Sequence, residues 1–538
     1  MSKFVLNLSG RCWDHLTGPK QFSLKGAANL NGNPIGAAQL FEQLNTATTP
    51  EALTQVLERL NGFYTWVLQE DTRLLAAVDH IRSRPIFYGH TSGRFYLSDD
   101  AEWVRQQVAD IAMDPIAREE FLLSGYVTGQ DTLYPDVKQL QAGEFLEVEH
   151  RKGELYINTH RFFRFWHTEP EFYDEIKLRQ KLEEVTMNVM RRLTKYAAGR
   201  QLVVPLSGGY DSRLIVTMLK RLGYENVLCF TYGVPGNKEA EYSQKVAETL
   251  GFKWVFIEYS TSGWQEAWRS TAAEDYKRTA ANHVSLPHVQ DWLAIRELVV
   301  RKYIDNESIL VPGHSGDFVA GSHIPSFVFE KKQHSEDSLL QALIKNNLSN
   351  APKDGMSLAS TNKLSDRVRD CIGSKFDGSD VQFANLYELW DWQERQSKYI
   401  VNSVRVYEQF GLHWWLPFWD VEFLQFWESV PLILRKKRVW FVAWIDDKYK
   451  ESSPAMSSKD DLGNAAEQSM LFKTLVKIAK KLPSPIQHKL KRNLHRRKVK
   501  SHSLAFEGLV TDGNLKSYLS KKYNMIGIYS ELYIKSKW

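Results

Sequence analysis

Residues 207–213 read Ser-Gly-Gly-Tyr-Asp-Ser-Arg, and they follow directly behind the apolar run Gln201–Leu206 (QLVVPL). That run predicts a buried strand, and Arg213–Leu222 (RLIVTMLKRL) predicts a helix behind the turn. A glycine-rich turn between a strand and a helix can bind an anion, because the backbone approaches closely and the helix N-terminus points N–H groups at the ligand. The order of these elements therefore predicts a phosphate-binding loop.

Polar side chains complete the predicted loop. Ser207 and Ser212 add hydroxyl donors, while Gly208 and Gly209 leave room for the phosphate. Asp211 would be misplaced beside phosphate without a bridging cation, so we interpret it as a Mg²⁺ ligand. The Gly-Lys-Ser/Thr ending of a Walker A loop is absent. The stretch resembles the pyrophosphate loop of the ATP pyrophosphatases, which cleave ATP to AMP and pyrophosphate. The alternative is a tight strand–helix turn with polar decoration.

Composition and cysteine usage indicate a globular protein of a reducing compartment. The chain has 538 residues, of which 43% are hydrophobic and 25% charged, and this length fits roughly three domains. The three cysteines, Cys12, Cys229 and Cys371, are widely spaced and odd in number, which excludes a disulfide framework and a cysteine-based zinc site. The N-terminus lacks the apolar core of a signal peptide, and no apolar run is long enough to cross a membrane. We expect a cytoplasmic location.

Three regions differ in their patterns, and together they predict an α/β class. Residues 1–165 contain short apolar and aromatic runs between turn residues, which predict the strands of an α+β domain. Residues 166–460 begin with alternating strand and helix signals, typical of a parallel sheet covered on both faces, and continue as a helical, Trp-rich part. Ligands of such sheets bind at the carboxyl ends of the strands. Residues 461–538 form a C-terminal extension.

Several further motifs agree with one family. Phe230-Thr-Tyr-Gly233 follows the second predicted strand of the parallel sheet, Gly313-His-Ser-Gly-Asp317 follows the fourth, and Leu416-Pro-Phe-Trp-Asp420 comes later. With the phosphate loop, these stretches resemble the synthetase half of the asparagine synthetase family. Upstream, Asp79…Arg84-Pro-Ile-Phe-Tyr88 resembles the interior of the glutaminase domain of that family.

This resemblance implies a fold and a reaction. The expected fold is an Ntn-like α+β sandwich in degenerate form, followed by an ATP-pyrophosphatase domain (adenine nucleotide alpha hydrolase-like) with a helical C-terminal part. The expected cofactors are ATP and Mg²⁺. In that family ATP adenylates a carboxylate and pyrophosphate leaves. Ammonia or an amine then attacks the acyl-adenylate and gives an amide and AMP.

The resemblance also implies roles for residues around the phosphate. The loop residues named above would hold pyrophosphate and its metal, and Gly313 would belong to the loop that faces them. Asp317 matches the second metal-binding acid, and two carboxylates can face one pyrophosphate across Mg²⁺. The alternative role of Asp317 is a helix N-cap.

Two other groups have implied roles. Phe230, Thr231, Tyr232 and Gly233 would frame adenine and ribose through backbone groups, or else form an ordinary buried strand end. The family carries a lysine that stabilises phosphate charge in the transition state, and Lys437 matches it best, with the neighbouring Lys436 in reserve. The alternative is a solvated basic turn.

The chain departs from the family in its glutaminase half. The family begins with a cysteine after the initiator Met, which acts as the nucleophile, and this chain has Ser2 there. Cys12 cannot replace that cysteine, because no terminal amine lies beside it. The segment that grips glutamine is shortened to Leu30-Asn-Gly-Asn33. A serine can act as an N-terminal nucleophile, yet these changes together predict a domain that does not hydrolyse glutamine.

A second departure lies in the loop before Asp317. His314 stands where the asparagine synthetases carry Glu, and Phe318 replaces a second acid. His314 could act as a base near neutral pH, or it could merely hydrogen-bond the loop. Either reading makes the acceptor site differ from that of an ordinary asparagine synthetase.

A basic segment lies near the C-terminus. Residues 471–500 carry eleven Lys and Arg and no Asp or Glu, whereas the whole chain has a net charge of +5. Apolar residues between 471 and 482 fall on one helical face and lysines on the other. This pattern suits an anionic membrane surface, with the protein peripheral to the inner membrane. The alternative is a helix packed on the preceding domain; nucleic-acid binding is not expected, because no recognition fold accompanies the charge.

These observations leave several functions open. The first is an AMP-forming amide ligase without glutaminase activity. Its acceptor would be aspartate, or a carboxylate on a small molecule, a surface glycan or a peptide precursor, and its donor would be ammonia or an amine. The second is a non-catalytic nucleotide-binding partner in a biosynthetic assembly. Two metal-binding acids favour the enzyme, because a scaffold does not need them.

Overall fold

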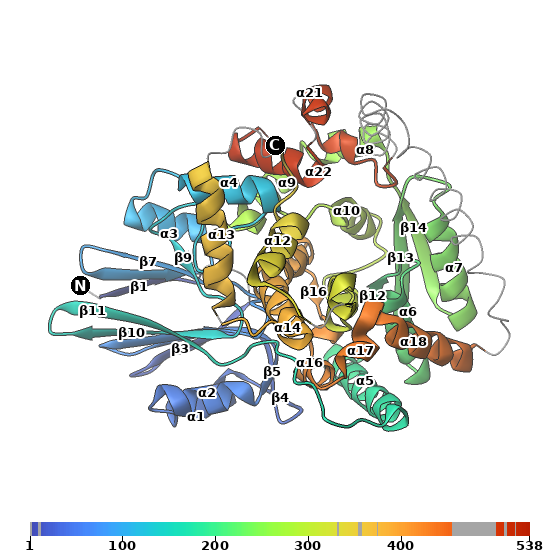
Figure 1. The fold of residues 1–538 in the computed structure, drawn as a ribbon, viewed down its shortest axis with the longest axis horizontal. Helices are drawn as coiled ribbons and strands as arrows, with labels where there is room; N and C mark the ends of the chain where they lie inside the picture. The colour runs from blue at the N-terminus through green and yellow to red at the C-terminus, as the bar shows by residue number, and fades with distance from the viewer. Residues whose placement is uncertain are drawn as a thin grey trace.

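The computed structural model describes residues 3–8, 12–330, 333–352, 358–373, 375–453, 502–510, 514–521 and 523–537. Ser2 and the basic segment 471–500 lie outside these residues. Figure 1 shows an N-terminal domain of two β-sheets on the left, a parallel sheet on the right, and helices between them. No helix among the described residues combines the length and the hydropathy that crossing a membrane requires.

The N-terminal domain is a sandwich of two sheets. One sheet has the strand order β1-β8-β7-β9, and the other has the order β11-β10-β6-β5-β3-β2, with β4 paired to β3. The strands and helices of this domain are β1 (Phe4–Asn7), β2 (Trp13–Leu16), β3 (Gln21–Leu30), β4 (Asn33–Ile35), α1 (Ala37–Asn45), α2 (Pro50–Glu58), β5 (Leu60–Gln69), β6 (Arg73–Val78), β7 (Phe87–Thr91), β8 (Arg94–Ser98), α3 (Ala101–Val108), α4 (Pro115–Ser124), β9 (Lys138–Gln139), β10 (Glu144–Arg151) and β11 (Glu154–Arg161).

Apolar layers hold this sandwich together. Val67 of β5 and Leu97 of β8 belong to the cluster between the sheets. Leu53 of α2 packs with Trp66 on the outer face of the larger sheet, and α3 covers the smaller sheet. The side chain of Thr49 caps α2 by accepting the Ala52 N–H at 3.2 Å. The sequence Thr49-Pro-Glu is typical of a helix start and predicts this cap. The predicted α+β sandwich is confirmed.

The central domain is built on a parallel sheet with the order β14-β13-β12-β15-β16. Its first part contains α5 (Glu175–Ala197), β12 (Leu202–Pro205), α6 (Tyr210–Arg221), β13 (Val227–Gly233), α7 (Lys238–Leu250), β14 (Lys253–Glu258), α8 (Thr261–Ala267), α9 (Thr271–Ala281), α10 (Trp292–Val300), β15 (Ile309–Leu310) and α11 (Gly316–Val319). All four strand pairs are parallel. Figure 1 shows α7 and α10 on opposite sides of β13 and β14, so helices cover both faces.

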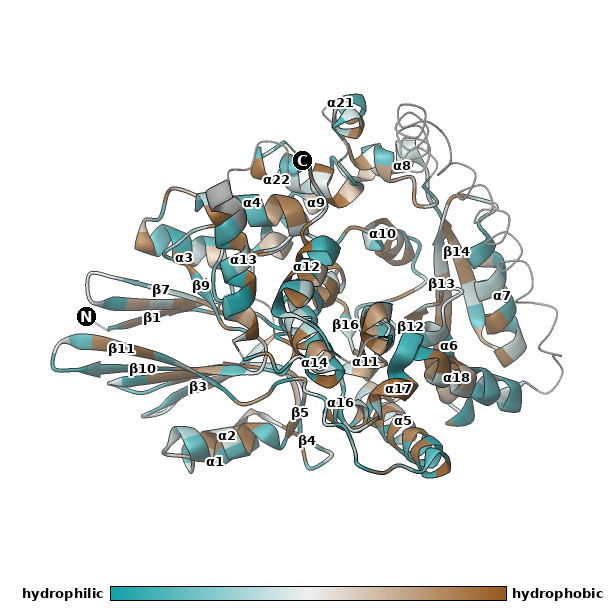
Figure 2. Cartoon of the chain, viewed as in Figure 1, coloured by the Kyte–Doolittle hydropathy of each residue, from teal (hydrophilic) through white to brown (hydrophobic). Residues whose placement is uncertain are grey.

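Helices make up most of the remaining chain. They are η1 (Ser326–Phe329), α12 (Glu336–Asn347), α13 (Leu358–Ile372), α14 (Asp380–Trp390), η2 (Asp391–Ile400), η3 (Val401–Ser403), α15 (Val404–Gln409), η4 (Pro417–Trp419), α16 (Val421–Glu428), α17 (Leu432–Arg435), η5 (Lys436–Arg438), α18 (Val439–Ser452), η6 (Phe506–Leu509), α21 (Leu515–Ser520) and α22 (Met525–Ile534), with strand β16 (His413–Trp414) among them. Figure 2 shows hydrophobic and hydrophilic residues alternating around α5, the pattern of a helix with one buried face.

The apolar spacing of Leu386–Phe410 predicts one long helix, and the structure interrupts it. Its middle, η2, is a π-helix of ten residues, which widens the turn and is frequent at functional sites. Buried charges of η2 reach the N-terminal domain. Lys398 donates to the carbonyl groups of Val127 at 3.0 Å and Gly129 at 2.7 Å, and Glu394 accepts the Gly129 N–H at 3.0 Å. Part of the predicted extension also packs on the domains, since Trp264 Nε1 donates to the Leu504 carbonyl at 2.8 Å.

Candidate active site

The predicted phosphate loop lies between β12 and α6, at the carboxyl end of the central strand. Gly209 is the N-cap of α6, and no side chain caps this helix end. A helix N-terminus without a side-chain cap can donate its N–H groups to an anion. The Ser207 backbone N–H donates to Ser212 Oγ at 3.2 Å, and the Gly209 N–H donates to Ser207 Oγ at 3.1 Å. The two hydroxyls hold the loop in the open shape that an anion needs.

A second loop, residues 313–317, packs directly against the first. A Cβ atom added at Gly313 would lie 2.8 Å from the Ser212 backbone nitrogen. A Cβ atom added at Gly316 would lie 2.9 Å from Cγ of Asp211. Only glycine permits this approach, so the two glycines bring Asp317 to the phosphate loop.

Asp211 and Asp317 meet where these loops touch. Burial raises the pKa of Asp211 to about 7, Arg438 opposes that rise, and the negative charge of Asp317 adds to it. A divalent cation would relieve this repulsion, so the donor set fits Mg²⁺. No cluster of three or more His, Cys, Asp or Glu side chains that could hold a metal occurs within the described ranges. Phosphate oxygens would therefore supply the other ligands.

Asp317 is held by a histidine that the sequence analysis did not identify. His323 Nε2 lies 3.5 Å from Asp317 Oδ2, and His323 Nδ1 lies 2.5 Å from Oδ2 of the buried Asp391. Burial acts against the imidazolium, but Asp391 and Asp317 outweigh it and raise the pKa of His323 to about 10. Burial would raise the pKa of Asp317, yet the hydrogen bond and charge of His323 lower it to about 2. Asp317 is therefore ionised at neutral pH.

The predicted nucleoside segment is the end of β13. Phe230 and Thr231 are buried, and the Thr231 hydroxyl donates to the Leu206 carbonyl at 2.5 Å. Gly233 has φ of 144° and approaches the Ser503 carbonyl, so a Cβ there would lie 2.8 Å from that oxygen. Tyr232 stacks on Tyr259 with ring centroids 5.2 Å apart. The side chains of Phe230–Gly233 thus contribute to packing. A ligand could contact this segment through its backbone groups.

The predicted catalytic lysine, Lys437, lies in the basic run 435–438. The residue of this run that contacts the phosphate loop is Arg438. Arg438 Nη1 lies 3.1 Å from Asp211 Oδ1. Lys437 has φ of 53° and is exposed, while Lys436 Nζ lies 5.7 Å from the centroid of the Phe329 ring. Arg435 is fully buried and pairs with Glu388 at 2.7 Å. The family resemblance points to Lys437 and Lys436 in this run, and it gives no role to Arg438.

His314 and Phe318 occupy different surroundings. His314 is half-buried, and its Nδ1 lies 3.2 Å from the Ser403 hydroxyl oxygen. Burial, with the neighbouring His288 next, lowers the pKa of His314 to about 4, so its imidazole is neutral at pH 7. Phe318 is fully buried and packs 5.3 Å from Phe165, centroid to centroid. The position of the family acid is thus part of the core.

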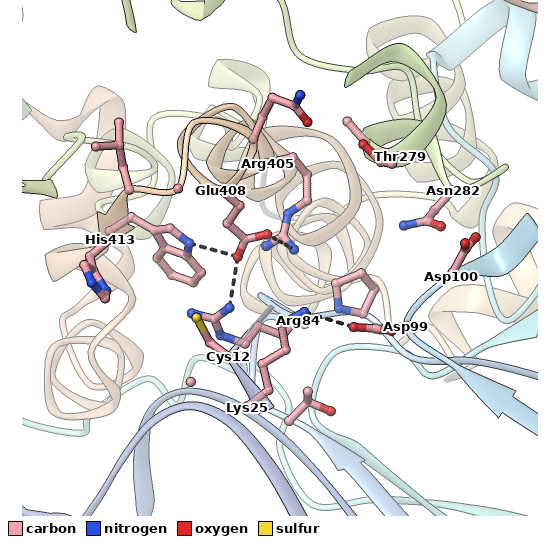
Figure 3. Close-up of a pocket in the computed structure, with 18 of the residues that line it drawn as sticks. Cys12, Lys25, Arg84, Asp99, Asp100, Thr279, Asn282, Arg405, Glu408 and His413 are labelled. Atoms are coloured by element: carbon pink, nitrogen blue, oxygen red, sulfur yellow. Dashed lines mark hydrogen bonds and ion pairs between the residues drawn. The ribbon is translucent and has the colours of Figure 1, made fainter. Parts of the chain in front are cut away.

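A large cavity lies away from these groups, between the two domains (Figure 3). It has a volume of about 770 Å³, and its lining includes the N-terminal Lys25 and Arg84 and the central Arg405 and Glu408. Arg84 Nη1 pairs with Glu408 Oε1 at 2.9 Å, and Arg405 Nη1 pairs with Glu408 Oε2 at 2.7 Å. Because β16 begins at its wall, the cavity faces the amino ends of the parallel strands, opposite the phosphate loop.

Comparisons with known proteins agree with this geometry. Residues 182–449 match the family described as asparagine synthase, and residues 46–163 match a glutamine amidotransferase domain. A probable glutamine-hydrolysing asparagine synthetase of Acanthamoeba polyphaga mimivirus is 25% identical over 222 residues, which is 41% of this chain and 36% of that protein. The microcin J25-processing protein McjC of Escherichia coli is 20% identical over 312 residues, 57% of this chain and 55% of McjC. The chain thus spans about half or less of these relatives.

Among solved structures, the NH3-dependent NAD synthetase of Campylobacter jejuni aligns with 38% of this chain and 99% of its own, at 16% identity and a TM-score of 0.21. That score is too low to add to the assignment. The amidotransferase match falls within the N-terminal sandwich, and the asparagine synthase match spans most of the parallel-sheet domain. The chain therefore belongs to the asparagine synthetase family.

Proposed function

We propose that this protein is an ATP-dependent amide ligase that forms AMP and pyrophosphate. It activates a carboxylate as an acyl-adenylate, and ammonia or an amine attacks that intermediate. One observation carries the proposal. Two acids, the mostly buried Asp211 and the partly exposed Asp317, meet beside an uncapped helix N-terminus at the carboxyl edge of a parallel sheet. A nucleotide-binding scaffold has no need of two carboxylates beside phosphate, because they repel it.

The residues of this site have distinct tasks in the proposed reaction. The N–H groups at the start of α6 and the hydroxyls of Ser207 and Ser212 bind the departing pyrophosphate. Asp211 and Asp317 would hold Mg²⁺, which when bound offsets the negative charge that the leaving group gains. Arg438 neutralises Asp211 in the absence of ligands. Lys437 is proposed to reach the transferred phosphate in the transition state.

The nucleoside and the acceptor would lie on opposite sides of the phosphate loop. Strand order places β13 on one side of β12 and β15 on the other. Backbone groups of Phe230–Gly233, at the end of β13, are proposed to frame adenine and ribose. The acceptor carboxylate would then approach over β15, where Gly313 and His314 follow the strand.

The nitrogen donor is proposed to be free ammonia or an amine supplied by another molecule. The reason is the sequence of the N-terminal domain, which carries Ser2 in place of cysteine and a shortened glutamine-binding segment. A fold that keeps its sandwich core but lacks the nucleophile acts as a structural partner of the central domain. The ligase then uses no nitrogen released from glutamine.

The acceptor is proposed to be a carboxylate on a peptide precursor. The Escherichia coli relative McjC supports this choice, because that protein is named for the processing of microcin J25. Aspartate and a surface glycan are the other acceptors that the chemistry admits. A peripheral interaction of residues 471–500 with an anionic membrane also remains a proposal, and that segment lies outside the described residues.

A pyrophosphate-release assay tests the proposal. The full-length protein is incubated with ATP, Mg²⁺ and one carboxylate at a time: L-aspartate, a uronic acid, and synthetic peptides with a single Asp or Glu side chain. Ammonium chloride or methylamine serves as donor. Pyrophosphate release that depends on a carboxylate, with AMP as the second product, supports the ligase. Binding of ATP without release under every combination supports the alternative, a non-catalytic nucleotide-binding partner.

A further inference from the structure

A buried acid and a histidine stand together on the acceptor side of the candidate site, and neither has a role in the family resemblance. His288 lies in the loop between α9 and α10, and Asp291 ends that loop as the N-cap residue of α10. His288 Nδ1 lies 3.7 Å from Asp291 Oδ1. Asp291 has only 3% of its surface exposed, so its carboxylate is held inside the protein beside the imidazole.

Three buried tyrosines fix this loop in place. The hydroxyl of Tyr276 donates to the His288 carbonyl at 2.5 Å, and the hydroxyl of Tyr259 donates to the Gln290 carbonyl at 3.0 Å. The hydroxyl of Tyr407 donates to Asp291 Oδ2 at 2.8 Å. The tyrosines come from three separate segments of the chain. Such convergence positions a side chain more firmly than ordinary loop packing, and it is the kind of support that a reactive group requires.

The loop places His288 beside the residues that follow β15. The centroid of the His288 ring lies 6.5 Å from that of His314 and 6.2 Å from that of Tyr399. A nitrogen atom in hydrogen-bond contact with both imidazoles would lie about 4 Å from each centroid, so rings at this separation can share one amine. Asp291, His314 and Tyr399 are the polar groups that face His288 from α10, the loop after β15 and η2.

The two histidines differ in what surrounds them. His288 has a carboxylate beside Nδ1, whereas His314 has the neutral hydroxyl of Ser403 beside its own Nδ1. A carboxylate beside Nδ1 orients the imidazole ring and favours the tautomer with its proton on Nδ1, so Nε2 is the nitrogen that can accept a proton. Asp291 is itself kept ionised, because the hydrogen bonds and charge of His288 and the Tyr407 hydroxyl lower its pKa against the effect of burial.

Resting on the amide ligase proposed above, we propose that His288, oriented by Asp291, is the base that accepts the proton of the attacking amine. The neutral amine nitrogen bonds to the acyl carbon. The bond between that carbon and the phosphate-linked oxygen breaks, and its electron pair leaves with AMP. The surplus proton on nitrogen passes to Nε2 of His288 and then to solvent. His314 stays neutral and orients the amine.

Separating the two half-reactions tests this assignment. ATP–pyrophosphate exchange with a carboxylate and no amine reports adenylation, and amide formation with methylamine reports the second step. The full-length His288→Gln variant is expected to keep exchange within threefold of the native rate, while amide formation falls by about 10² to 10³. If His288 is the base, native amide formation should slow at acidic pH, and the variant should lose that decline. His413→Gln, which alters a histidine on the interdomain cavity, is the matched control.

Asp291→Asn provides the second variant, because its side chain can still accept the Tyr407 hydroxyl. It should reduce amide formation about tenfold, a typical fraction of the effect of a general base, and shift the acidic decline. Amide formation within threefold of native in a folded His288→Gln protein overturns the proposal, as does an equal loss of both half-reactions. If the native protein shows no carboxylate-dependent exchange with any compound of the panel, the proposed function fails and this inference fails with it.

Discussion

Arg438 Nη1 lies 3.1 Å from Asp211 Oδ1, although 227 positions separate the two residues in the chain. The contact joins the start of α18 to the phosphate loop. It places a positive charge beside the mostly buried carboxylate of Asp211. Asp317 has the corresponding contact with His323. Each of the two acids therefore carries its own protein cation, which a metal ion and a phosphate would have to displace or share.

Asp211→Asn is expected to lower pyrophosphate release below about a tenth of the native rate, because a contact bridged by a metal ion contributes several kcal/mol. Release of pyrophosphate in the presence of saturating ATP, Mg²⁺ and an accepted carboxylate is the measurement. Asp447→Asn, which changes an exposed acid of α18, should leave the rate unaltered. A rate above a tenth of native in the folded Asp211 variant contradicts the assignment.

Substitutions of Lys437 and Arg438 should affect kcat and KM for ATP differently. Lys437 is exposed in the ground state, so Lys437→Met should lower kcat and leave KM for ATP nearly unchanged. Arg438→Met removes the partner of Asp211 and should change both constants. Steady-state kinetics with varied ATP provide the comparison. If Lys437→Met retains the native kcat, the assignment of Lys437 is wrong, and Arg438 is the cation that stabilises the transition state.

Gly313→Ala should weaken nucleotide binding more than the small size of the added methyl group suggests. The added Cβ would lie 2.8 Å from the Ser212 backbone nitrogen, and backbone on both sides prevents easy relief. We expect the affinity for ATP to fall about tenfold or more, because the helix N-terminus proposed to bind phosphate must move. Isothermal titration with ATP and Mg²⁺ measures it. Gly36→Ala, where nothing lies within 4 Å, is the control and should bind normally.

Glutamine should not serve as nitrogen donor, whereas ammonium or an amine should. The reason is Ser2 in the place of the family cysteine. Glutamate production from glutamine by the purified protein is the direct measurement, compared with the Ser2→Ala variant. Glutamate formed by the native protein and lost on that substitution would prove the N-terminal domain active.

His314 should make stability depend on pH. The unfolded chain protonates this histidine below its ordinary pKa of about 6.5, while the folded protein keeps it neutral down to about 4. The native state therefore loses stability as pH falls from about 6.5 to 4 and gains none from this group above that range. His314→Gln should remove part of the decline in Tm between pH 7 and pH 5. His90→Gln, at an exposed position, should not, and equal declines in both variants and the native protein would refute the linkage.

Local patterns made the phosphate loop predictable, and distant contacts made other parts of the site unpredictable. The loop belongs to one contiguous strand–turn–helix unit, Leu202–Arg221, so periodicity and glycine placement suffice to locate it. Asp317 is also found, because its loop resembles a family motif. Arg438, His323 and His288 gain their roles from partners on other elements. Nothing in the sequence around them distinguishes a residue beside an acid from a solvated charge.

The helical pattern of 386–410 shows a second limit of sequence reading. Its apolar spacing correctly predicts helix, but a π-helix has nearly the same local pattern as an α-helix over ten residues. The difference lies in where Asp391 and Lys398 point, and that depends on the domains packed around them. The sequence thus predicts the element, whereas tertiary packing sets its geometry.

The contacts between η2 and the N-terminal domain make that domain part of the structure of the central domain, whether or not it hydrolyses glutamine. Lys398 and Glu394 are fully buried, and three of their hydrogen bonds go to Val127 and Gly129 of that domain. Removing the N-terminal domain would take the carbonyl and N–H partners from this pair, and a hydrogen bond to a charged group contributes about 1.5–3 kcal/mol. A substitution that ends the glutaminase chemistry would leave these contacts intact, whereas deletion of the N-terminal polypeptide would destabilise the central domain.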